Sequence, residues 1–74
     1  MAQNDIAGLY REFEEAYVDF LTAEGEGELL ARQKKLYRAR TRLLADKDFT
    51  EQEYEGAVLR ADTRARALAG QTPL

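Results

Sequence analysis

The side chains that could carry out chemistry in this chain are carboxylates, lysine, arginine, tyrosine and threonine. The 74 residues include no His, no Cys and no Trp, and the printed sequence contains no Ser. Nucleophile pairs of the Ser/His and Cys/His types are therefore excluded, as are metal sites built from imidazole or thiolate. Histidine, the usual acid and base at neutral pH, is absent as well. We expect a protein that is not an enzyme and that holds no cofactor.

Carboxylates near the start of the chain are the remaining candidates for a metal site. Glu12, Glu15 and Asp19 lie within two turns of a predicted helix, on the side opposite its apolar residues, and so are expected to face water. A di-metal carboxylate bundle needs inward Glu residues together with a Glu-x-x-His pair, and the chain has no His. The stretch 46–50 begins like a calcium-binding EF-hand loop but lacks the Gly and the final Glu of that loop. No bound metal is expected.

Charge is strongly segregated along the chain. Residues 29–45 hold six cations and no acid, whereas residues 1–28 hold eight acids and one base, and residues 46–59 hold five acids and one base. The overall net charge is −3 and the pI is about 4.9. One interpretation is that a basic helix lies between two acidic helices and pairs with their flanks. Such exposed pairs are worth about 0–1 kcal/mol each, so they would set the arrangement more than the stability.

The second interpretation is that the cations of this basic segment bind a partner. Residues at intervals of four project from one side of a helix, as Lys34, Arg38 and Arg42 do. An acidic protein surface is favoured over nucleic acid, because the chain is acidic overall and shows no named nucleic-acid motif. Tyrosines near arginines are also frequent interface anchors, although a core position is their default. The predicted partner-binding residues are Lys34, Lys35, Arg38, Arg40, Arg42, Tyr10 and Tyr17.

Helical periodicity divides the chain into three segments, and no stretch of useful length alternates like a strand. The first predicted helix covers about residues 5–24, begins at a cap on Asn4 or Asp5, and is expected to end at Gly25 and Gly27. Val18 is an apolar residue on its otherwise polar side, as Leu59 is on the third helix. Together these two residues slightly favour an association surface.

The second predicted helix covers about residues 27–45 and has two apolar seams with a spacing of seven. The first seam is Leu29, Leu36 and Leu43, and the second is Leu30, Tyr37 and Leu44. Two seams predict that this helix packs between two neighbours. Gln33 and Arg40 lie midway between the seams, and each is expected either to reach the rim of the face or to meet an acidic group of a partner.

The third predicted helix covers about residues 50–69. Thr50 and Glu53 have the spacing of a capping box, and Phe49 and Tyr54 that of a hydrophobic staple. Gly70 should end the helix, which leaves residues 70–74 as a frayed tail. The short link 46–49 predicts that the second and third helices are antiparallel neighbours.

These features predict one all-α domain over residues 1–74, a three-helix bundle with up-down-up topology and short links. A helical hairpin with a long kinked first helix is the alternative if Gly25 and Gly27 do not turn the chain. The 21 apolar residues larger than alanine give a thin core, which favours a homodimer or dependence on a partner. No targeting segment or membrane-spanning run is recognisable, so a cytoplasmic protein is expected.

The function predicted from the sequence is protein–protein interaction without catalysis. The chain would be a small acidic regulator, inhibitor or assembly subunit that acts through its helix faces. A nucleic-acid-associated accessory protein that uses the basic face of the second helix is the alternative.

Overall fold

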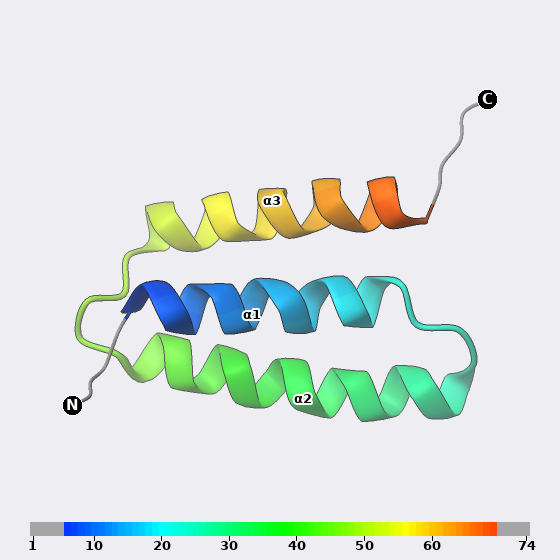
Figure 1. Ribbon diagram of the computed structural model, residues 1–74. Coiled ribbons are helices and arrows are strands. Elements are labelled where there is room, and N and C mark those ends of the chain that lie inside the picture. Colours follow the sequence, from blue (N-terminus) through cyan, green and yellow to red (C-terminus); the bar gives the residue numbers. More distant parts are fainter. Residues whose placement is uncertain (1–5, 70–74) are drawn as a thin grey trace.

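The computed structural model describes residues 6–69 and contains three α-helices, α1 (Ile6–Leu21), α2 (Glu26–Ala45) and α3 (Glu51–Leu68). The chain runs along α1, returns along α2 and reverses again into α3 (Figure 1), and the described residues contain no strand. The predicted three-helix, up-down-up bundle is confirmed, and the alternative hairpin is excluded by the turn between α1 and α2. The predicted helix start at residues 4 and 5 and the tail 70–74 lie outside the described residues.

The turn between α1 and α2 depends on Gly25, which has a φ of 95°. This is the left-handed region that glycine adopts without steric cost, and it lets the chain reverse into α2. The Thr22 hydroxyl donates to the Val18 carbonyl at 2.9 Å, and the Glu24 N–H donates to the Glu28 carboxylate at 2.9 Å. The Val18 carbonyl also accepts the Thr22 N–H at 3.0 Å, and the Glu28 side chain occupies a backbone N–H just before α2. The helix α1 ends at Leu21, three residues before the predicted end.

The start of α3 confirms most of its sequence signature. The Thr50 hydroxyl accepts a hydrogen bond from the Glu53 N–H at 3.2 Å, and the rings of Phe49 and Tyr54 lie 5.7 Å apart. The Thr50 N–H donates to the Tyr10 hydroxyl at 3.4 Å, and that hydroxyl donates to the Thr50 carbonyl at 3.1 Å. In a complete capping box the Glu53 side chain would accept the Thr50 N–H. Here the Tyr10 hydroxyl of α1 accepts it instead.

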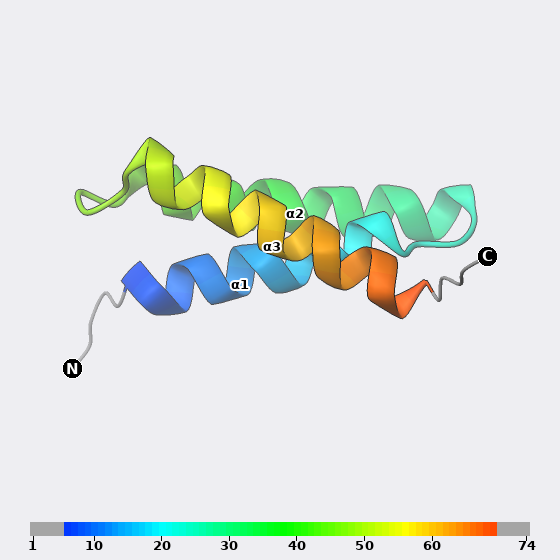
Figure 2. The same cartoon turned by 90° about the horizontal axis from the view of Figure 1, so that it is seen from above.

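The middle helix of the bundle is α1, and not the basic α2 as predicted. Both α2 and α3 pack against α1, while no Cα atom of α2 comes within 8 Å of a Cα atom of α3. Figure 1 shows α1 between the other two helices, and Figure 2 shows α3 running obliquely to α1. The expectation that α2 and α3 are adjacent is therefore wrong, although the link between them is short.

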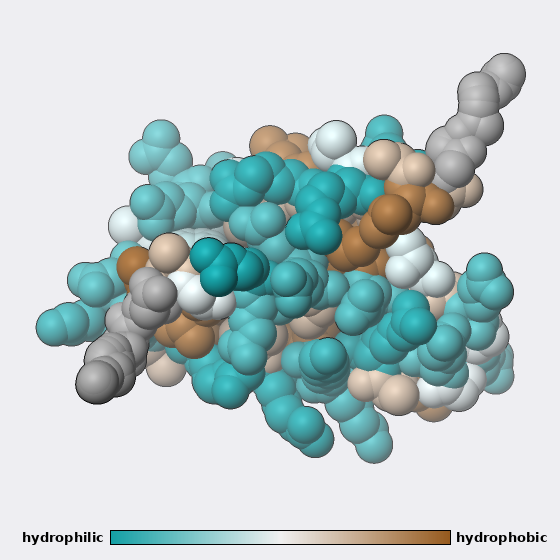
Figure 3. All heavy atoms as spheres, in the orientation of Figure 1, coloured by the Kyte–Doolittle hydropathy of each residue, from teal (hydrophilic) through white to brown (hydrophobic). Residues whose placement is uncertain are grey.

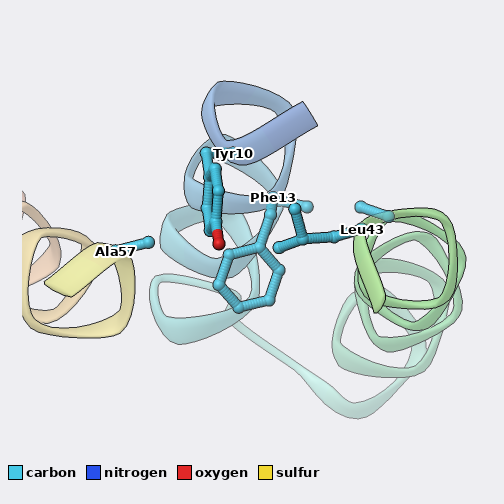
Figure 4. Packing of buried hydrophobic residues seen from close by; sticks show 6 residues of the cluster. Tyr10, Phe13, Leu43 and Ala57 are labelled. Atoms are coloured by element: carbon cyan, nitrogen blue, oxygen red, sulfur yellow. The ribbon is translucent and has the colours of Figure 1, made fainter. Parts of the chain in front are cut away.

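The composition of the core explains this arrangement. Large side chains come mainly from α1, with Tyr10 and Phe13 buried, whereas α2 contributes Leu43 and α3 contributes Ala57 (Figure 4). Phe13 and Leu43 are the largest fully buried side chains of the described residues. Since the buried side chains of α3 are all alanine, α2 and α3 each need the bulky residues of α1 to fill the space beside them.

A second, smaller cluster corrects the prediction for Val18. This side chain is only 4% exposed and packs with Ala61 and Ala65 of α3. The alanines let α3 approach α1 closely enough to cover a position that the periodicity of α1 places on its polar side. Leu59, the other apolar residue predicted on a polar face, is 67% exposed.

Candidate functional site

The two apolar seams of α2 have different environments. Leu43 of the first seam is fully buried and Leu36 is half-buried, because this part of the seam faces α1, while Leu29 at its start is 38% exposed. The second seam is exposed: the accessible fractions are 58% for Leu30, 65% for Tyr37 and 40% for Leu44. The sequence predicted a neighbouring helix on each seam, but only one neighbour is present on α2. The second seam is therefore an apolar stripe on the surface, and Tyr37 is not the core residue that its position on a stripe suggested.

Cations border this exposed seam on both sides. Lys34 lies three residues before Tyr37 and Arg40 three residues after it, so both are its direct neighbours on the helix surface. Tyr37 also shares an open hollow with Arg38, Thr41 and Arg42. Seen from the side of Figure 1, hydrophilic side chains cover much of the molecule, including the part formed by α2 (Figure 3).

The cations of α2 fall into paired and unpaired groups. Arg42 pairs with Glu12 of α1 at 2.9 Å, and Arg32 pairs with Glu28 at 2.9 Å while donating to the Asp19 carbonyl at 2.7 Å. No ion pair involves Lys34, Lys35 or Arg38 within residues 6–69, and all three side chains are exposed. Arg42 and Arg32 thus link α2 to α1, whereas Lys34, Lys35 and Arg38 are exposed without an ion pair among the described residues.

The prediction of a basic helix between two acidic ones is therefore wrong. The backbone of α2 packs against α1 alone, and no ion pair joins α2 to an acid of α3 within residues 6–69. Asp62 of α3 pairs within its own helix, with Arg66 at 3.0 Å. The cations of α2 keep more uncompensated charge than an enclosed helix would.

Arg40, one of the two odd residues between the seams, reaches across to α3. Its Nε donates to the Tyr54 hydroxyl at 3.1 Å, and this bond raises the pKa of Arg40 above its ordinary value. Both Arg40 and Gln33 are exposed, in agreement with the expectation that they reach the rim of the apolar side of the helix. The bond to Tyr54 is a side-chain link between two helices whose backbones stay apart.

The two tyrosines predicted to bind a partner lie in or beside the core. Tyr10 is 7% exposed, and its hydroxyl is bonded to the backbone of Thr50. Tyr17 is half-buried, with its ring 5.6 Å from that of Phe13. The structure therefore brings together the predicted cations of α2 on one exposed helix, but separates them from these tyrosines. Tyr37 is the aromatic residue that lies among the cations.

An ion pair between α1 and α3 was not foreseen. Arg60 donates two hydrogen bonds to one oxygen of Glu14, at 2.7 and 3.1 Å, and the Glu14 carboxylate raises the pKa of Arg60. The pair borders a cleft of about 420 Å³ lined by Ile6, Ala7, Tyr10, Arg11, Glu14, Glu53 and Arg60. Glu14 lies four residues after Tyr10, at the edge of the apolar stripe. This position is the feature of the sequence that could have indicated a contact between Glu14 and a neighbouring helix.

This cleft offers two guanidinium groups and two carboxylates, but it lacks a nucleophile paired with a base. Among the described residues no group of three or more acids is placed to hold a metal ion. Glu12, one of the acids expected only to face water, is paired with Arg42. The exposed second seam of α2 with its bordering cations, called the α2 face below, is the best candidate for a functional surface.

Comparisons with protein families, with curated proteins and with solved structures find no match to this chain. Within residues 6–69, no helix has both the length and the apolar character needed to cross a membrane. The functional interpretation of the α2 face therefore comes from its geometry and its charge.

Proposed function

We propose that this chain is a non-enzymatic protein-binding module, a small regulator, inhibitor or assembly subunit that contacts its partner through the α2 face. One observation supports this most strongly: Leu30, Tyr37 and Leu44 are exposed at a regular spacing of seven on a helix that already packs on α1 through Leu36 and Leu43. The lack of cysteine fits a reducing compartment, and we propose the cytoplasm as the place of action.

Regular spacing distinguishes this seam from ordinary exposed apolar residues. Single apolar side chains on a protein surface are common and need no functional explanation, as for Leu59 on α3. A seam with heptad spacing, in contrast, is the element through which helices recognise one another. Tyr37 lies at its centre beside arginines, and tyrosine and arginine are enriched among the residues that dominate binding energies.

Nucleic-acid binding is the second candidate function. It is favoured by Lys34, Lys35 and Arg38, which are exposed and form no ion pair with the part of the chain that the structure describes. It is opposed by the net charge of −3, because phosphate binding needs a surplus of cations near the contact. A basic surface that also exposes an apolar seam fits a protein partner better than a phosphate backbone.

Site-specific photocrosslinking tests the proposed function. A photoreactive amino acid replaces Tyr37 in one variant and Leu59 in a control, two exposed positions with nearly equal accessible fractions of 65% and 67%. We expect the variant at position 37 to crosslink to a protein in the cell of origin, and the variant at position 59 to give no such product. Equal protein products from both positions would contradict a binding role for the α2 face.

The same experiment distinguishes the second candidate. A crosslinked product that nuclease removes would identify nucleic acid as the partner. A gel shift of duplex DNA at physiological salt, abolished by charge reversal at Lys34 and Arg38, would support the same conclusion. Binding of that kind weakens steeply with salt, by a log–log slope of about −0.9 for each phosphate contacted.

A further inference from the structure

We propose that the partner of the α2 face is an acidic amphipathic helix that lies along α2 and packs its own apolar seam on Leu30, Tyr37 and Leu44. This inference rests on the proposed function and specifies the chemistry of the partner. It follows from the length of the seam, from the charge on both of its borders, and from the poor fit of a second copy.

The length of the seam sets the size of the partner. From Leu30 to Leu44 the helix advances about 21 Å, at about 1.5 Å per residue. A partner helix of roughly 15 residues or more can cover this distance, and apolar residues spaced by seven would meet the three anchors in register. The backbone of α2 is helical over the whole seam, so its hydrogen bonds are internal and side chains make the contact.

The charge bordering the seam sets the sign of the partner. Lys34 and Arg38 lie on one side of Tyr37 and Arg40 on the other, and all three side chains are exposed. In paired helices the positions that flank the apolar seam form ion pairs between the chains and decide which partners are accepted. A helix with Glu or Asp at its flanking positions would neutralise these cations, whereas a basic helix would be repelled.

A second copy of this chain fits the α2 face poorly. In a two-fold symmetric dimer the same patch meets itself, so Lys34, Arg38 and Arg40 would face the identical cations of the other copy. Contact of the α2 face with the acidic first half of α3 of another copy is heterologous, and it leaves one α2 face free at one end and one α3 surface free at the other. Such contacts continue into filaments unless they close into a ring.

Two synthetic peptides test the proposal with the full chain. Each peptide has about 21 residues, with leucine on a three-heptad seam. The flanking positions are Glu in one peptide and Lys in the other. We expect the acidic peptide to bind, with NMR shift changes concentrated on residues of α2 around Tyr37. The basic peptide should produce no saturable change in the same range of concentration.

Matched variants locate the contact. Tyr37→Ala should weaken binding of the acidic peptide by about tenfold or more, as truncation of a central aromatic anchor does. Leu59→Ala removes an equally exposed side chain from α3 and should leave binding unchanged. The double variant Lys34→Glu, Arg38→Glu should lose the acidic peptide and gain the basic one, whereas Arg64→Glu on α3 should change neither. Circular dichroism confirms that each variant is folded.

The outcomes separate this inference from the proposed function. Equal binding of both peptides at the α2 face would overturn the acidic partner but leave a protein-binding face. Shifts on α2 that depend on the concentration of this chain alone would make a second copy the occupant and overturn the inference. If neither peptide changes the spectrum and duplex DNA shifts the same residues, both the inference and the proposed function are wrong.

Discussion

Leu43 and Leu44 are adjacent in the sequence, belong to different seams of α2, and provide the most direct test of the packing. Leu43 is fully buried against α1, whereas Leu44 is 40% exposed. Replacing each by alanine makes the same chemical change on the same helix with the same effect on helix propensity. Any difference in the free energy of unfolding between the two variants therefore reports the packing of the two seams.

The structure predicts a large effect for Leu43→Ala. Removal of a fully buried leucine side chain costs about 2–5 kcal/mol, because it loses the transfer free energy and leaves a cavity. A domain of this length is expected to have a total stability of about 4–11 kcal/mol, so Leu43→Ala removes a large part of it. The melting temperature should fall by roughly 12–24 °C for a loss of about 3 kcal/mol. For Leu44→Ala we expect a loss of about 1 kcal/mol or less.

Urea denaturation followed by circular dichroism measures both variants at low micromolar concentration. Comparable losses for the two variants would refute the assignment of Leu44 to an uncovered seam. A loss for Leu44→Ala that appears only at high protein concentration would show that another copy covers this seam.

Three further predictions concern local features of the fold, and the same denaturation experiment checks each. Gly25→Ala should lower the free energy of unfolding by about 1 kcal/mol, since Gly25 has a φ of 95°. Gly27→Ala within α2 should raise the free energy of unfolding by up to about 1 kcal/mol, because a methyl group there has open space around it. Thr50→Ala should cost about 0.5–2 kcal/mol and Thr50→Ser much less, because serine keeps the hydroxyl that caps α3; equal losses would contradict the cap. Ala61→Leu should destabilise the fold by about 1–3 kcal/mol, because Ala61 is fully buried where α3 approaches α1; a neutral result would mean that the two helices are not in close contact.

Part of the candidate site could be predicted from the sequence. The cations Lys34, Lys35 and Arg38 are exposed on one helix, as their spacing and charge indicated. Tyr37 was expected in a packed seam, and its exposure changes the site from a set of charges to an apolar stripe with charged borders. Tyr10 was expected to contact a partner, but its hydroxyl is bonded to Thr50, 40 residues further along the chain. No local pattern in the sequence records such a contact.

The sequence by itself determined the three helices and the start of α3. The Thr50 cap, the ring contact between Phe49 and Tyr54 and the turn at Gly25 involve residues at most five positions apart, so local propensity and spacing were sufficient. The tertiary structure alone decided which helix lies in the middle and which seam of α2 is covered. Two seams of equal spacing look alike along the chain. Burial of the first seam depends on the bulky residues of α1 meeting Leu36 and Leu43, which lie in a distant part of the sequence.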